Sequence, residues 1–485
     1  MSVLDRKFNY SSNKAYTKPF LITCNLILNT IILLLALKIK LFTFETWLFP
    51  FTMLSLVQLF INLITISKLE KRFLSLTNLF LIFSYITHMG ILVIFGFKID
   101  IELPWNPLVS ITKDTFKDAC SFAVLCHAFL TFGMCIVLFK RKTYHLGSNS
   151  TNFKEENSQL YIARMIGFIL VLIGIVPMLY IDISRVILFI SGNYLDTYKV
   201  GVNGFVVIIS RFAEIGAIML LIGNYKDKKK AHFILFIIVI YESIVMFTGN
   251  RGRPIMFLLT IFFIYNNLIK RVGFKQFINS VAVVYLLGFL LTFIGQIRML
   301  SIKDFATIAD LFKKSFMEFS IFKILADFGA TIISLGYSLV FFPQTASFQL
   351  GSNYLVSLLT IFPNVGGLLA PIINKTVYIN NWPANYREFL GGSYLGELYY
   401  SFGDFSFIFA VLIGMFIAFI SNKVQESIIV KNYVSLSIYL ILFPNILWWT
   451  RNYFVGMVRE FVWIAVVILI LYSIISKVPK RSSGG

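Results

Sequence analysis

The chain has 485 residues, of which 58% are hydrophobic, 17% aromatic and only 14% charged, and its formal net charge is +20. Ordinary soluble domains carry about 25% charged residues, so this composition cannot cover a large water-facing surface and excludes a soluble protein. Most of the Lys and Arg excess falls in short polar segments between apolar runs, where it orients a membrane protein. The positive charge is therefore no argument for nucleic acid as a partner.

Apolar runs of about 17 to 25 residues are long enough to cross a bilayer. Taken in chain order, the sequence predicts about 12 of them, so we expect an all-α, polytopic integral membrane protein. The bias of Lys and Arg between the two sides predicts that both termini are cytoplasmic. The predicted spans are approximately residues 20–37, 47–66, 73–97, 118–139, 161–181, 202–223, 233–248, 254–269, 279–296, 404–421, 433–448 and 461–476.

One connection is long, and it lies on the outer side in this topology. Residues 297–403 are apolar and aromatic, so we expect amphipathic helices on the outer leaflet that cap a cavity. The chain then divides into residues 1–296 with spans one to nine, the large outer loop 297–403, and residues 404–480 with the last three spans. Residues 481–485 end in Ser-Ser-Gly-Gly, which is typical of a tag remnant.

A charged pair lies inside the sixth predicted span. Arg211 is about ten residues into this span, on the order of 14 Å deep, and Glu214 follows it at i+3 on the same helical face. Charge in a bilayer is expensive, so the pair either neutralises itself or places Arg211 in a wet cavity where it meets an anion. Both interpretations stay open.

Two arginines occupy the short outer turn "FTGNRGRPIM", residues 247–256. Arg251 and Arg253 could simply reach lipid phosphate, as basic residues at span ends commonly do. Gly249 and Gly252, however, permit close approach of a ligand, and Pro254 suits the first turn of the next helix. The N-terminus of that helix would also attract an anion, so the turn is a candidate anion site.

The last outer turn, "WWTRNYFVGMVREF" at residues 448–461, repeats this arrangement. It holds Arg451 and Arg459 among aromatic residues, which by themselves are typical of a membrane interface. Arg is suited to bidentate phosphate recognition, so arginines around one outward cavity indicate a bound diphosphate.

Carboxylates near these arginines are candidate general bases. They are Glu397, Asp327, Glu388 and Glu460. Glu397 stands out because glycines flank it in "GGSYLGELYYSFG", and neighbouring tyrosines offer stacking surfaces to a sugar: Tyr394, Tyr399 and Tyr400. The chain has no Walker loop, GxGxxG, HExxH or DxD motif, so no cofactor or metal is expected.

Four stretches together resemble a known family. "GNRGRP", then "GSNYLVSLLTIFPN" and "GGSYLGELYYSFG" in the long outer loop, then "RNYFVGMVREFVW", are similar to Wzy-type O-antigen and oligosaccharide repeat-unit polymerases of bacterial envelopes. The likeness runs in motif order over about residues 200–475. Similar proteins often have Glu where "LADFGAT" here has Asp327.

The resemblance implies a GT-C-like glycosyltransferase of the bacterial inner membrane with its active site facing the periplasm. Such an enzyme moves a growing glycan from undecaprenyl diphosphate to the non-reducing end of a new lipid-linked repeat unit, with inversion and without a metal. The partners that the resemblance implies are membrane lipids and, as a further option, a chain-length regulator. The implied diphosphate ligands are Arg251, Arg253, Arg298 and Arg451, then Arg211, Arg387 and Arg459.

The resemblance also implies that Glu397, or else Asp327, is the base. Two other functions stay open. An O-antigen ligase uses the same donor with a different acceptor, and a flippase would carry the lipid-linked repeat unit across the membrane.

Overall fold

The computed structural model describes residues 17–103, 105–140, 153–191, 201–247, 252–271, 289, 293, 296–297, 304–317, 320–362, 367–387 and 391–477. All regular elements in these ranges are helical, which confirms the all-α prediction. Ten helical stretches there are long and apolar enough to cross a membrane, so the protein is an integral membrane protein.

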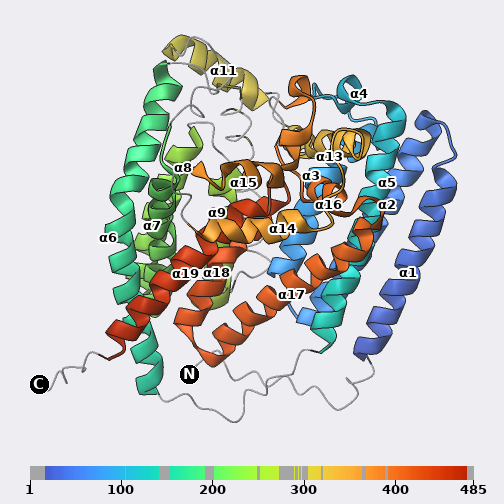
Figure 1. Cartoon of the computed structure of the whole chain (residues 1–485). Helices are drawn as coiled ribbons and strands as arrows, with labels where there is room; N and C mark the ends of the chain where they lie inside the picture. The colour runs from blue at the N-terminus through green and yellow to red at the C-terminus, as the bar shows by residue number, and fades with distance from the viewer. Residues whose placement is uncertain are drawn as a thin grey trace, which may run out of the picture.

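The first five helices form one side of the molecule, with α1 at its edge (Figure 1). Their apolar faces share a buried core, in which Trp47, Phe51, Phe80 and Phe116 are fully enclosed. Buried polar side chains also join these helices, as where Gln58 donates to the carbonyl of Val124 at 3.0 Å. The bounds are α1 Thr17–Ile39, α2 Phe44–Glu70, α3 Leu76–Gly96, α4 Pro107–Ser110 and α5 Lys113–Phe139.

The next four helices form the opposite side, where the long helix α6 marks the edge (Figure 1). Their bounds are α6 Phe153–Ser191, α7 Gly204–Gly223, α8 Lys228–Phe247 and α9 Gly252–Ile264. α6 and α7 pack closely because Gly167 and Gly216 face each other, and a Cβ on either would lie 2.7 to 2.8 Å from the carbonyl oxygen of the other. Small residues at such crossings let membrane helices approach closely.

The last three helices connect these two sides: α17 Ser406–Val430, α18 Tyr433–Trp449 and α19 Val455–Ile475. α17 crosses α5 at two glycines, where a Cβ on Gly133 would overlap the carbonyl of Val411 and one on Gly414 the carbonyl of Leu130. α18 packs against α9, α17 and α19.

Short helices precede α17, and they are α11 Phe305–Met317, α12 Ile321–Gly329, α13 Thr331–Phe341, α14 Ser352–Ser357, α15 Ala370–Thr376 and α16 Tyr394–Phe402. α11 is a surface helix near the end of α6 (Figure 1), and its Ile308 and Leu311 pack on a cluster that includes Phe189 of α6. These helices fill the predicted outer loop.

The predicted and observed spans differ in three segments. Two of them, the predicted spans 233–248 and 433–448, form α8 and α18, which are not among the ten candidates. The predicted span 279–296 lies mostly outside the described residues. Ile321–Phe341, which includes α12 and α13, is a candidate span although an amphipathic helix was expected there. The polar side of this segment faces protein, because Ser334 and Ser338 are buried and donate to main-chain carbonyls at 2.8 Å.

The α5–α17 crossing yields a stability prediction. Gly414→Ala should destabilise the fold by about 1–3 kcal/mol, because the added Cβ meets backbone that cannot move aside. Unfolding can be followed with a thiol-reactive dye, since Cys120, Cys126 and Cys135 are buried. Gly201→Ala is the matched control, because no atom of the described residues lies within 4 Å of a Cβ there. Equal melting temperatures for the two variants would contradict the described crossing.

Candidate functional site

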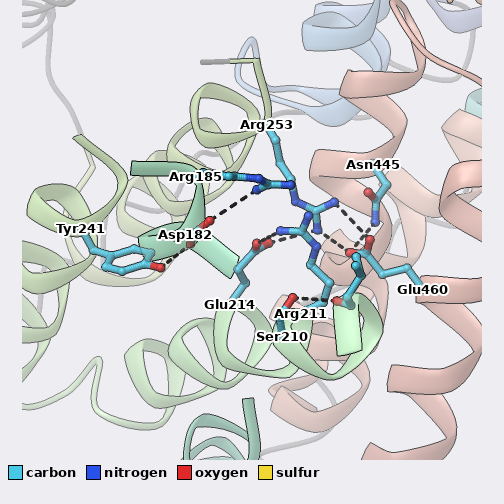
Figure 2. Close-up of polar contacts among 10 residues, drawn as sticks. Asp182, Arg185, Ser210, Arg211, Glu214, Tyr241, Arg253, Asn445 and Glu460 are labelled. Atoms are coloured by element: carbon cyan, nitrogen blue, oxygen red, sulfur yellow. Dashed lines mark hydrogen bonds and ion pairs between the residues drawn. The ribbon is translucent and has the colours of Figure 1, made fainter. Parts of the chain in front are cut away.

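Three arginines from three helices converge on one group of polar side chains (Figure 2). Arg185 lies near the end of α6, Arg211 two turns into α7, and Arg253 in the first turn of α9. Their side chains are only 27%, 18% and 20% exposed, respectively. Guanidinium groups this enclosed need acidic partners or a bound anion.

Two glutamates hold Arg211 and Arg253. Glu214 accepts from Arg211, as its i,i+3 spacing predicted, and its second oxygen accepts from Arg253 Nη2 at 3.1 Å. Glu460 of α19 accepts from Arg253 Nη1 at 3.2 Å and Nη2 at 2.7 Å, which is a bidentate pair. Asn445 of α18 donates to the same carboxylate at 3.2 Å. We call these five residues the arginine network.

Arg185 is held more loosely beside this network. Its Nη1 donates to Asp182 Oδ1, one turn earlier on α6, at 3.4 Å. Asp182 also accepts a short hydrogen bond from the hydroxyl of Tyr241 on α8. The next residue, Glu242, is buried, and its carboxyl makes no hydrogen bond or ion pair with another described residue.

The arginine network leaves two donors unused. The Nε atoms of Arg211 and Arg253 are buried and have no hydrogen-bond partner in the described part of the chain. A buried donor without a partner costs about 1–3 kcal/mol, so two of them on arginines that share Glu214 require an explanation. An anion that accepts from both Nε atoms supplies one.

The start of α9 packs tightly beside these donors. A Cβ on Gly252 would overlap the ring of Trp448 on α18, so only glycine permits this approach. Gly252, the second glycine of "GNRGRP", therefore lets the N-terminus of α9 pack against α18. The N–H groups and dipole of a helix N-terminus favour an anion at this point. Arg251, in the same turn, lies outside the described residues, as do Arg298 and Glu388.

The other predicted arginines have different surroundings. Arg387 Nε donates to the carbonyl of Trp382 at 2.7 Å, and Arg459 Nε donates to the carbonyl of Thr360 at 2.5 Å. Both bonds fix main-chain turns of the segment before α17. Among the predicted diphosphate ligands that the structure describes, Arg211 and Arg253 are brought together, because both donate to Glu214.

Arg451 lies in the turn between α18 and α19. Its guanidinium carbon is 5.5 Å from the centre of the Phe328 ring. Phe328 directly follows Asp327 in the sequence of α12. Gly392 packs on the same turn, since a Cβ there would lie 2.7 Å from the backbone carbon of Asn452. The turn is thus enclosed by α12 and by the glycines before α16.

Glu397 holds this turn from α16. It is 1% exposed, and its carboxylate accepts from Trp449 Nε1 at 2.8 Å and from the amide of Phe454 at 3.0 Å. Burial, together with the Glu397 carboxylate, raises the pKa of Tyr453 in the same turn. Glu397 therefore holds the two ends of the α18–α19 turn together. Its role as a base remains a prediction.

The three tyrosines predicted to face a sugar lie in the core. Tyr394 and Tyr400 are fully buried and Tyr399 is 9% exposed. The hydroxyl of Tyr394 bonds Ser84 at 2.8 Å, and that of Tyr400 donates to the carbonyl of Lys375 at 3.1 Å. Their rings therefore have no open face for stacking in this structure, because helix α16 is buried on all sides and not on one.

The site residues predicted from the sequence do not include four members of this region: Asp182, Arg185, Tyr241 and Asn445. The predicted fifth span ended at residue 181, whereas α6 continues to Ser191 and brings Asp182 and Arg185 onto a helix. Their i,i+3 spacing could have indicated the pair. Glu460 had been considered as a base, but it binds Arg253.

Comparison with known proteins identifies a family. A model of the family described as O-antigen polysaccharide polymerase Wzy matches residues 25–482, nearly the whole chain. Searches of curated proteins and of solved structures found no match.

The arginine network yields an energetic prediction. Glu460→Gln should destabilise the protein by about 3 kcal/mol, since it deprives a mostly buried guanidinium of a bidentate partner. In a double-mutant cycle, Arg253→Gln and Glu460→Gln should couple by more than about 1 kcal/mol. The exposed pair Lys113–Glu45 is the control and should show no measurable coupling. Additive effects of the Arg253 and Glu460 substitutions would mean that the pair is not formed in the membrane.

Proposed function

The chain belongs to the O-antigen polysaccharide polymerase family Wzy, and from this we propose that it transfers a growing glycan from undecaprenyl diphosphate to a new lipid-linked repeat unit. Members of this family are glycosyltransferase-like polymerases that act on lipid-linked oligosaccharides in membranes. The observation that carries our proposal is the pair of unused Nε donors on Arg211 and Arg253.

These two donors suit the leaving group of the reaction. When the bond between the anomeric carbon and the diphosphate breaks, negative charge grows on the diphosphate oxygens. Arg211 and Arg253 are already oriented by Glu214 and Glu460, so they can stabilise this charge without reorganising. The N-terminus of α9 adds N–H donors on the same side. Arginine can thus supply the electrophilic help that many transferases take from a metal.

We propose a single inverting displacement. A carboxylate removes the proton from the acceptor hydroxyl at the non-reducing end, and the oxygen forms the new bond to the anomeric carbon. The bond from that carbon to the diphosphate breaks, and the carrier leaves with the electron pair. A base needs only to lie within hydrogen-bond reach of the hydroxyl.

Two carboxyls compete for the role of base. Glu397 was predicted from its flanking glycines, but its oxygens are taken by Trp449 and Phe454. Glu242 is a buried carboxyl that follows Tyr241 in α8, and a hydroxyl bound to it would displace no hydrogen-bond or ion-pair partner among the described residues. We therefore favour Glu242 as the base and Glu397 as the residue that positions the α18–α19 turn.

The distribution of charge supports an orientation. Lys226 and Lys230 follow α7, at the end opposite to Arg211. Because cytoplasmic loops collect Lys and Arg, we propose that this end is cytoplasmic and that the arginine network opens to the periplasmic side of the inner membrane. Residues 297–403 would then cover the site from outside, in a GT-C-like arrangement.

The function is tested by the surface polysaccharide of a deletion strain. Loss of a polymerase should leave acceptors that carry one repeat unit, and the wild-type gene should restore long chains. Arg253→Lys should reduce chain formation on the order of tenfold or more, because Lys keeps the charge but loses the bidentate geometry. Arg164→Lys in α6 is the matched control, because Arg164 lies 21 residues before Arg185 on the same helix and donates to the carbonyl of Leu160. Unsubstituted acceptors together with long lipid-linked chains would indicate a ligase instead.

The base is tested by two isosteric changes compared in purified protein. Glu242→Gln should abolish transfer while donor binding survives, since the amide cannot accept the proton. Glu397→Gln should lower the melting temperature and reduce transfer only in part, because its amide can still accept one of the two bonds. The reverse pattern, with Glu397→Gln inactive yet stable, would return the base to Glu397.

A further inference from the structure

Arg185 differs from the other two arginines in how it is held. Its contact with Asp182 is 3.4 Å, longer than the 2.7 and 3.1 Å contacts that Arg253 makes with Glu460 and Glu214. Its side chain is also the most exposed of the three, at 27%. A guanidinium has five N–H donors, and only one of those on Arg185 has a partner among the described residues. Arg185 therefore retains most of its capacity to bind an anion.

Asp182, the partner of Arg185, is held in place by a second hydrogen bond. The hydroxyl of Tyr241 on α8 donates to Asp182 Oδ2, while Arg185 uses Oδ1. The carboxylate is thus shared between two helices and fixed between them. Figure 2 shows the Arg185 side chain directed past Asp182 toward Arg253.

Arg185 is directed toward Arg253, and Arg253 and Arg211 share the carboxylate of Glu214 (Figure 2). Glu214 and Glu460 balance Arg211 and Arg253, and Asp182 balances Arg185. Three cations held side by side with unused donors on each are suited to an anion that spans them, and a single phosphate offers fewer oxygens for this than two joined phosphates.

We propose that Arg185 binds the second phosphate of the lipid carrier and makes the site select a lipid diphosphate over a lipid monophosphate. The inference rests on the proposed function, because it assigns the donor site to the arginine network. Arg211 and Arg253 hold the phosphate nearest the N-terminus of α9, and Arg185 reaches the other from α6. Tyr241 and Asp182 are positioning residues for Arg185.

The test measures binding of undecaprenyl diphosphate and undecaprenyl monophosphate to the full-length protein in nanodiscs at one fixed salt concentration. Wild-type protein should prefer the diphosphate by about tenfold or more. Arg185→Gln should lose this preference by weakening diphosphate binding about tenfold, while monophosphate binding changes less than about twofold. Arg185→Lys should fall between the two, because it keeps charge without the planar fork.

Arg164→Gln is the matched control, since it removes an arginine from the same helix at the opposite end and should keep the wild-type preference. Tyr241→Phe keeps every charge and should weaken diphosphate binding to a smaller extent than Arg185→Gln. If Arg185→Gln and Arg185→Lys both keep the wild-type preference, while Arg253→Gln loses diphosphate binding, the role of Arg185 is refuted and the proposed function stands. If wild-type protein binds neither lipid, the proposed donor site itself fails.

Discussion

Charge buried among membrane helices is the constraint on which this site depends. An isolated guanidinium in such surroundings costs far more than the fold can supply, so each arginine must be paired or must hold an anion. Arg253 meets this need through Glu214 of α7 and Glu460 of α19, two carboxylates from distant parts of the chain. The pairing requires α7, α9 and α19 to meet at one level, and Asn445 brings α18 to the same place. The arginine network thus joins four helices, and it also holds the two unpartnered Nε donors that make it the candidate anion site.

The segment before α17 is connected to this junction through α18. Trp449, which donates to Glu397, lies one turn after Asn445, about 6 Å along the helix. Glu397 in turn fixes the α18–α19 turn that contains Arg451. A movement of the segment before α17 would therefore reach the arginine network through a single helix, α18. This arrangement fits a site in which the cover and the diphosphate ligands must be placed together.

Local patterns predicted much of this structure. Apolar runs indicated the membrane helices, and i,i+3 spacing indicated the Arg211–Glu214 pair, because both depend on neighbouring residues. The partner of Arg253 could not be found in this way, since Glu460 lies 207 residues further along the chain. Arg185 was not assigned to the site, because the predicted span ended at residue 181 whereas α6 continues to Ser191. The tyrosines of α16 were expected to be accessible, but the packing that buries them comes from helices elsewhere in the sequence, such as Ser84 on α3.

The most direct measurement is a structure of the full chain in nanodiscs with undecaprenyl diphosphate bound. The account predicts diphosphate oxygens within hydrogen-bond distance of the Nε atoms of Arg211 and Arg253, with the Glu214 and Glu460 pairs intact. A diphosphate bound elsewhere, with the arginine network closed and both Nε atoms facing protein or lipid, would contradict it.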